Sequence, residues 1–136
     1  MEEIRSSILL EKNELMYLIH YCADGDRNAN TAALEKFTGI TEADDRKAVA
    51  GLTRKNIVHP AGNRLVIVNL FDFYIRKLLS AGSMEMTGSG MNKLAFYHPG
   101  FILLLEEHKL SQDHLTIRAF RGKQDLNEFM RSSDSQ

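Results

Sequence analysis

The stretch from Thr41 to Val68 constrains the fold of this chain more than any other. Its first part carries apolar residues at the three- and four-residue spacing of a helix, among them Val49 and Leu52. Two short runs rich in β-branched residues follow, 57–59 and 65–68, and the residues between them include Pro-Ala-Gly-Asn, which strongly favours a turn. The stretch therefore predicts a helix followed by a β-hairpin.

Two further helical patterns precede this stretch. The first has apolar residues at i, i+3, i+4 and i+7: Leu15, Leu18, Ile19 and Cys22. The second is predicted to begin at Asn30 or Thr31 and to end at Gly39, a favourable C-terminal cap. Thr41 and Asp44, three residues apart, resemble a capping box for the third helix. Three helices followed by a hairpin are the element order of a winged helix.

A fourth helix is predicted from Leu70 to Ala81, with one strongly apolar side. The segment 83–92 after it has the composition of a flexible linker, because it contains Gly-Ser-Gly. The last third of the chain then changes character. Three β-strands are predicted there, over 94–98, 101–108 and 115–121. A closing helix is predicted to follow them over 125–130.

These elements together predict an α+β protein with two parts. Residues 1–82 would form a winged-helix-like unit, and 83–92 would form the linker. Residues 93–136 would form a small three-stranded antiparallel sheet with a C-terminal helix.

Composition and charge argue against several classes of protein. The chain has 136 residues and a net charge of −1, so it has no overall cationic field to attract nucleic acid or anionic lipid. Cys22 is the only cysteine, which excludes an intrachain disulfide and a multi-cysteine metal site. No apolar run approaches the roughly 20 residues that span a bilayer. The N-terminus also lacks the pattern of a signal peptide. We therefore expect a cytoplasmic protein without membrane insertion.

DNA binding is the alternative function, because proteins with the element order of a winged helix often bind DNA. The N-terminal residues of the third helix would approach the bases, and here they include the carboxylates Glu42, Asp44 and Asp45. Basic residues in the same helix and in the hairpin compensate in part: Arg46, Lys47, Arg54, Lys55 and Arg64. A simpler interpretation is that the acids stabilise the start of the helix, and the bases its end, through the helix dipole.

A metal or catalytic site would have to come from the last third of the chain. The candidate ligands there are His98, His108, His114, Glu106 and Glu107. Two histidines and a carboxylate can bind a metal, but these residues lack the tight spacing of zinc motifs. The segment 88–93 lacks the spacing of a phosphate-binding loop and precedes a strand instead of a helix. We therefore predict no enzyme, no metal and no cofactor.

From Leu52 onward, the order of elements resembles that of the EspG-like chaperones of type VII (ESX-type) secretion. The matching segments are GLTRKNIVHPAG at 51–62, VNLFDFYIRKLLSAG at 68–82, LAFYHPGFILLLEE at 94–107, and LTIRAF followed by DLNEFM within 115–130. The resemblance implies a cytosolic, non-enzymatic adaptor that binds helical secretion substrates and keeps them soluble.

Two departures from that family bear on the prediction. Family members are about twice as long and have two similar halves, so the resemblance implies that a second copy or a related protein supplies the missing half. Lys55-Asn56-Ile57 also replaces the more usual glycine-containing turn. We carry over no functional residue from the family.

The sequence therefore predicts a protein-binding adaptor whose partner is a helical secretion substrate or a related subunit. A homodimer is compatible with this prediction, because an exposed sheet edge and an apolar fourth helix would suit such pairing. The predicted contact residues are aromatic, since aromatic anchors tend to dominate interface energy: Phe73, Tyr74, Phe96, Tyr97 and Phe101. The same aromatic side chains could instead fill the core.

Overall fold

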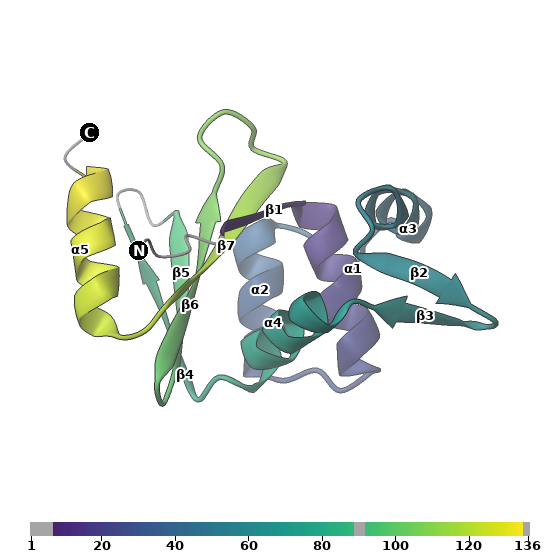
Figure 1. Ribbon diagram of the computed structural model, residues 1–136, viewed down its shortest axis with the longest axis horizontal. Helices are drawn as coiled ribbons and strands as arrows, with labels where there is room; N and C mark the ends of the chain where they lie inside the picture. The colour runs from purple at the N-terminus through teal and green to yellow at the C-terminus, as the bar shows by residue number, and fades with distance from the viewer. Residues whose placement is uncertain (1–6, 89–91, 135–136) are drawn as a thin grey trace. The chain divides into compact units, whose positions relative to one another are not determined.

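The computed structural model describes residues 7–88 and 92–134 and shows an α+β protein (Figure 1). The helices are α1 (Lys12–Ala23), α2 (Ala29–Thr38), α3 (Asp45–Arg54), α4 (Asn69–Ser80) and α5 (Lys123–Asp134). The strands are β1 (Ser7–Glu11), β2 (Val58–Ala61), β3 (Arg64–Ile67), β4 (Ser83–Thr87), β5 (Lys93–His98), β6 (Phe101–Glu107) and β7 (His114–Phe120).

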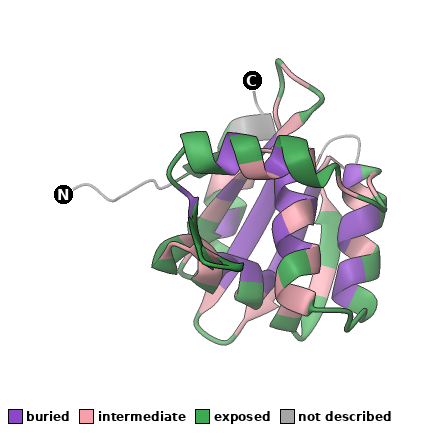
Figure 2. Ribbon diagram, turned by 90° about the vertical axis from the view of Figure 1, so that its right-hand side faces the viewer, coloured by how far each residue is buried: buried purple, intermediate pink, exposed green. Residues whose placement is uncertain are grey.

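The chain divides into two compact units. The helical unit is Glu11–Ser80, and the sheet unit is Ala81–Gln136 together with the segment that precedes Glu11. In both units the buried residues, drawn purple in Figure 2, lie along the helices and on the central strands. The helical unit has the predicted order of three helices, a hairpin and a fourth helix.

A side-chain cap sets where the second helix begins, and a glycine sets where it ends. The side chain of Asn28 accepts a hydrogen bond from the Thr31 N–H at 3.0 Å, so α2 begins slightly earlier than predicted. At its other end Gly39 has a φ of 76°, and its N–H donates to the Glu35 carbonyl at 2.8 Å. The predicted glycine cap is confirmed, because this left-handed backbone conformation favours glycine.

The predicted capping position of the third helix is wrong. The N-cap is Asp44 instead of Thr41, and its carboxylate accepts from the Lys47 N–H at 3.2 Å. Asn13 of α1 fixes this start. Its side-chain oxygen accepts from the Asp44 N–H at 2.7 Å, and its amide donates to the Asp44 carbonyl at 3.0 Å. A contact from another helix therefore decides which polar residue caps α3.

The hairpin that follows α3 is antiparallel, and one of its faces is turned toward the interior of the helical unit. Val58 pairs with Ile67, and Ala61 pairs with Arg64 next to the turn. Val58 is buried, whereas Arg64 is exposed on the alternate face. The Tyr21 hydroxyl of α1 lies 3.3 Å from both the N and the O of Leu65, which attaches α1 to β3.

The sheet unit contains a five-stranded sheet in the order β1-β7-β6-β5-β4, so the predicted three-stranded sheet is too small. The three predicted strands are its centre. The two added edge strands are β1, which comes from the start of the chain, and β4, which comes from the predicted linker. Residues 89–91 of that linker lie outside the described residues. The linker prediction failed for β4 because the glycine-rich composition belongs only to the residues after it.

A tight turn sets the register at the middle of this sheet. His98 pairs with Phe101 across Pro99-Gly100, and Gly100 has a φ of 92°. Helix α5 covers one face of the sheet. A buried apolar cluster joins Leu126 of α5 to Ala95 of β5 and to Ile102 and Leu104 of β6. Half-buried aromatic and methionine side chains pack around it: Tyr97, Phe120, Phe129 and Met130.

Candidate functional site

Strand β4 forms an open edge of the five-stranded sheet. All five of its residues pair with β5 in unbroken register, from Ser83 opposite Tyr97 to Thr87 opposite Lys93. Within residues 7–88 and 92–134 no strand pairs with its other side. Natural proteins often blunt such edges with charged side chains, especially lysine, or with proline or a β-bulge. Strand β4, with the sequence SMEMT, has no lysine, proline or bulge, and its one charged residue is Glu85.

The side chains of β4 divide by chemistry between the two faces. Met84 and Met86 lie on the face opposite α5, since they pair with residues outside the α5 cluster; Met86 is 42% exposed and Met84 is half-buried. Glu85 lies on the α5 face, because it pairs with Ala95 of the apolar cluster there. The open edge is therefore apolar on one face and acidic on the other.

A tyrosine on the neighbouring strand orients the carboxylate of Glu85. The Tyr97 hydroxyl donates to Glu85 Oε1 at 2.7 Å. Desolvation of the phenol, together with this hydrogen bond, raises the pKa of Tyr97 to about 12. The Nζ atom of Lys123 lies 5.6 Å from the centroid of the Tyr97 ring. Tyr97 therefore remains a neutral hydrogen-bond donor at physiological pH, and Glu85 is held at the edge.

An open hollow of about 650 Å³ adjoins the N-terminal end of β4, at Ser83–Glu85. It is lined by β4 residues, by the β5–β6 turn, by Arg121 and Gly122 just before α5, and by Lys123 at the start of α5, so that Arg121 and Lys123 place positive charge there. His98 and Phe101 stack beside the turn with ring centroids 4.7 Å apart. The hollow and the edge strand together form the candidate functional site of the sheet unit.

The five predicted protein-binding aromatics differ in exposure. Phe73 is exposed on α4, but its neighbour Tyr74 is buried. In the sheet unit Phe96 is fully buried, and Tyr97 and Phe101 are half-buried. Tyr97 pairs with Ile102, whereas Phe101 pairs with His98, so the two side chains lie on opposite faces of the sheet.

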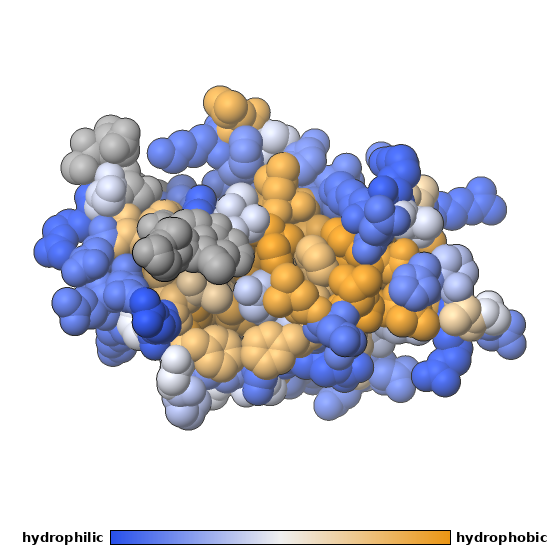
Figure 3. All heavy atoms as spheres, viewed as in Figure 1, coloured by the Kyte–Doolittle hydropathy of each residue, from blue (hydrophilic) through white to orange (hydrophobic). Residues whose placement is uncertain are grey.

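The helical unit also exposes apolar side chains. Figure 3 shows hydrophobic spheres near the start of α4 and the adjoining end of the β2–β3 hairpin. The large hydrophobic residues of this unit with substantial exposure are Tyr21, Val66, Leu70 and Phe73. Phe73 also lies 5.5 Å, measured at its ring centroid, from the Nζ atom of Lys77.

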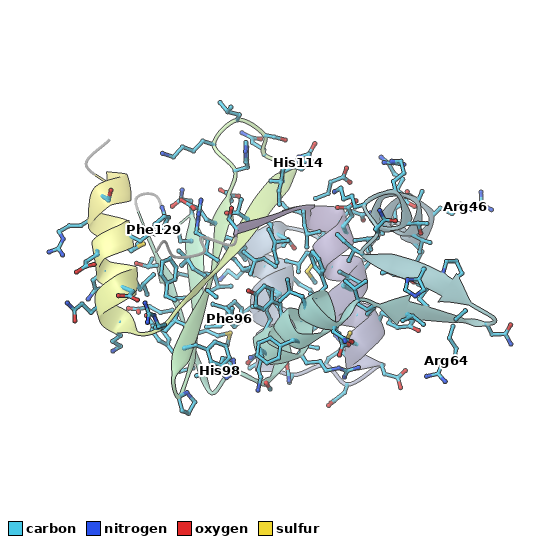
Figure 4. All side chains as sticks on the ribbon, in the orientation of Figure 1. Arg46, Arg64, Phe96, His98, His114 and Phe129 are labelled. Atoms are coloured by element: carbon cyan, nitrogen blue, oxygen red, sulfur yellow. The ribbon has the colours of Figure 1, made fainter. Side chains whose placement is uncertain are left out.

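The five predicted DNA-binding residues are exposed but not equally available. Arg46, Lys47 and Arg54 lie on the exposed side of α3, and Arg64 lies on β3. Arg46 and Arg64 extend away from the ribbon in Figure 4, in a region where Figure 3 shows mainly hydrophilic spheres. Lys55 differs because its Nζ donates to Glu14 Oε1 at 2.6 Å. It is therefore part of the fold of the helical unit.

Glu14 is a fully buried carboxylate that joins α1 to the end of α3. Besides Lys55, its Oε1 atom accepts from the Glu11 N–H at 3.0 Å, and its Oε2 atom has no hydrogen-bond partner in the described part of the chain. Gly51 of α3 leaves the space for this carboxylate, because a Cβ atom there would overlap Oε2. Glu14 thus determines how closely α3 approaches α1.

A second buried carboxylate in this unit joins α1 to α2. Glu35 accepts from Nε2 of His20 at 2.9 Å and also from the Arg27 guanidinium. The His20 hydrogen bond, aided by the nearby Arg27 charge, lowers the pKa of Glu35 although burial opposes the shift. These contacts stabilise the helices that support α3.

A buried ion cluster lies in the sheet unit between three adjacent strands. Glu106 Oε2 is 3.3 Å from Lys93 Nζ, and Glu106 Oε1 is 3.6 Å from Arg118 Nε. The Arg118 guanidinium also lies 4.9 Å from the centroid of the Phe129 ring of α5. The cluster links the strands to α5, and the Glu106 carboxylate serves as the counter-charge of Lys93 and Arg118.

The histidines that were candidate metal ligands have other partners. His108 Nδ1 accepts from the Leu110 N–H at 3.2 Å, and His114 Nδ1 lies 2.8 Å from the Ser111 hydroxyl. Among the described residues no three metal-binding side chains come together. The same residues contain no helix that is long and apolar enough to cross a membrane.

The sequence prediction missed the β4 residues Met84, Glu85 and Met86, which the structure places at the open edge. Their alternation of apolar and polar side chains was the available signal. Comparisons with known proteins add no assignment: no protein family, no curated protein and no solved structure matches the chain.

Proposed function

We propose that this chain is a non-enzymatic adaptor that binds another protein by continuing its five-stranded sheet at β4. The observation that carries the proposal is the open, regularly paired edge of β4, which has no lysine, proline or β-bulge. An extended segment added there would form main-chain hydrogen bonds along β4, which is a recurrent mode of peptide recognition. Exposed Met86 would then become covered.

The finer form of the proposal follows the resemblance described above. The helical unit would be a winged helix, and the chain would correspond to one half of an EspG-like chaperone of type VII secretion that acts in the cytoplasm. A related subunit or a second copy would supply the missing half. The exposed residues Leu70 and Phe73 of α4 support a separate contact with a helical substrate.

A charge at the open edge tests the proposal. Met86→Lys places a blunting residue on β4 at a position that is already 42% exposed, so the fold should tolerate it. The matched control is Leu110→Lys, which makes the same change at another exposed apolar residue of the sheet unit, 90% exposed. Thermal unfolding of both variants establishes that they remain folded.

We expect a protein partner to co-purify with the wild type and with Leu110→Lys, and to be lost from Met86→Lys. A photo-reactive amino acid in place of Met86 should cross-link to that partner, and one in place of Leu110 should not. Retention of the partner by Met86→Lys, with no cross-link from position 86, would overturn the role of β4.

DNA binding is the second candidate, favoured by the exposed cations Arg46, Lys47, Arg54 and Arg64. If this candidate is correct, affinity for a short duplex should fall steeply with salt, by a log–log slope of roughly 0.9 per neutralised phosphate. Arg46→Glu with Arg64→Glu should abolish binding, whereas Lys36→Glu, on exposed α2 surface, should reduce it only slightly. The adaptor proposal instead predicts no duplex binding at physiological salt, measured by fluorescence anisotropy.

A further inference from the structure

We infer that the segment received at β4 is an extended strand of another protein with an apolar–basic–apolar alternation of side chains. The inference rests on the proposed function and specifies the chemistry of its partner. It follows from how β4 distributes its side chains between the two faces of the sheet, and from the charge that the fold leaves at this edge.

The apolar part of the pattern comes from the two methionines. Side chains of neighbouring strands lie beside one another on the same face, so residues of an added strand on the face opposite α5 would lie against Met84 and Met86. Exposed apolar area is best covered by apolar side chains. Methionine also adapts to partners of different shape. Two apolar residues separated by one position therefore fit this face.

The basic part of the pattern comes from Glu85. Its side chain lies on the other face and is exposed, and Tyr97 holds one carboxylate oxygen through a neutral hydrogen bond at 2.7 Å. Among the described residues Glu85 has no cation within ion-pair distance, although Arg121 and Lys123 line the adjoining hollow. A lysine or arginine beside Glu85 in the added strand would supply this missing cation.

A second copy of β4 fits the same edge less well. Antiparallel pairing of two copies centred on Glu85 would place the two carboxylates directly opposite each other, which destabilises a strand pair. It would also offer no positive charge to either one. The same reasoning favours a partner strand with the opposite charge at its central position.

Short capped peptides test the inference directly. The probes are Thr-Val-Lys-Val-Thr, the same peptide with Glu in place of Lys, and the Lys peptide with N-methylated backbone amides. Binding to the full chain is measured by NMR shifts and by slowed hydrogen exchange of the β4 amides. We expect the Lys peptide to bind about two- to fivefold more tightly than the Glu peptide, the range of a cross-strand charge pair.

Two variants isolate the role of the Glu85 charge. Glu85→Gln keeps an acceptor for the Tyr97 hydroxyl and should remove the preference between the peptides. Glu85→Lys should reverse the preference. The N-methylated peptide should not slow exchange at β4, because it lacks the main-chain donors on which strand addition depends.

The outcomes separate this inference from the proposed function. Equal binding of both charged peptides would overturn the inference but leave strand addition at β4 intact. A partner that cross-links at position 86 without any peptide binding would also overturn the inference alone. If sedimentation shows a homodimer that Met86→Lys dissociates, the occupant is a second copy and the inference fails. If no peptide binds and position 86 cross-links nothing, both fail.

Discussion

The helical unit and the sheet unit hold their buried carboxylates in different ways. In the helical unit Glu14 is paired with Lys55, a residue 41 positions away whose side chain is 36% exposed at the end of α3. In the sheet unit Glu106 is paired with Lys93, which lies directly opposite on the next strand and is 3% exposed. Both carboxylates are buried, but only the second has a fully buried cation beside it.

This difference shows what each kind of packing requires. Between helices, a buried charge needs a cation long enough to reach it from the surface and a small residue, Gly51, that leaves room for it. Between strands, the ladder itself brings the two charged side chains together. We therefore expect the sheet pair to be more sensitive to loss of one partner, because no solvent can replace it.

Removal of the central carboxylate of the sheet unit should have the largest effect. Glu106→Ala leaves Lys93 buried without its counter-charge, and we expect a loss of about 3–4 kcal/mol in the free energy of unfolding, measured by chemical denaturation. Glu128→Ala, at an exposed carboxylate of α5, is the control and should change little. The pair Lys93→Met with Glu106→Leu should recover most of the loss; no recovery would contradict the pair's assigned role.

Removal of the cation of the helical unit should have a smaller effect. Lys55→Ala leaves Glu14 unpaired, but water can approach from the exposed side of Lys55, so we expect a loss of about 2 kcal/mol. Arg54→Ala, the exposed neighbour, is the control. If Lys55→Ala destabilises the chain as much as Glu106→Ala does, the contrast between the two units is wrong.

The second carboxylate of the helical unit should give a pH dependence. The pKa of Glu35 is lowered from 4.5, so its ionised form stabilises the fold fully above pH 4.5, and this contribution is lost as the pH falls through the lowered value. Glu35→Gln should therefore cost about 1–2 kcal/mol at pH 7 and progressively less in acid. The free energy of unfolding of the wild type and the variant is measured by denaturation at several pH values. A difference between them that stays constant with pH would contradict this role of the Glu35 carboxylate.

Replacement of Gly51, which leaves space for the Glu14 carboxylate, should change the free energy of unfolding least. Alanine in place of glycine inside a helix normally stabilises by about 1 kcal/mol. Here the added Cβ would overlap the Glu14 carboxylate, so Gly51→Ala should give no gain in the wild type. In a Glu14→Ala background the same change should stabilise by about 1 kcal/mol. A double-mutant cycle by denaturation checks this, and simple additivity would refute the steric coupling.

Local sequence signals predicted most of the elements because their causes are local. The spacing of Leu15, Leu18 and Ile19, all buried in α1, reflects the period of a helix. Pro99-Gly100 favours a tight turn, and the register of β5 and β6 follows from it, including Lys93 opposite Glu106. The α+β class and the helix–hairpin order were therefore predictable.

The residues of the candidate site were less predictable. Met84, Glu85 and Met86 alternate as a strand should, but a five-residue segment beside glycine and serine gives a weak signal. The predicted aromatics were chosen by residue type on the fourth helix and the predicted strands, and burial places Tyr74 and Phe96 inside the protein. Exposure depends on which elements pack together, and residue type does not determine it.

The sequence by itself determined the helices, the hairpin, the central strands and the positions of the turns, because backbone preference and hydrophobic period act over a few residues. Only the tertiary structure decided that Lys55 pairs with Glu14 and that Asp44, hydrogen-bonded by Asn13, caps α3. It also decided that β4 is an edge strand of the sheet with Glu85 exposed. These features join residues far apart in the chain. Their free energies therefore depend on the packed arrangement and not on any local segment.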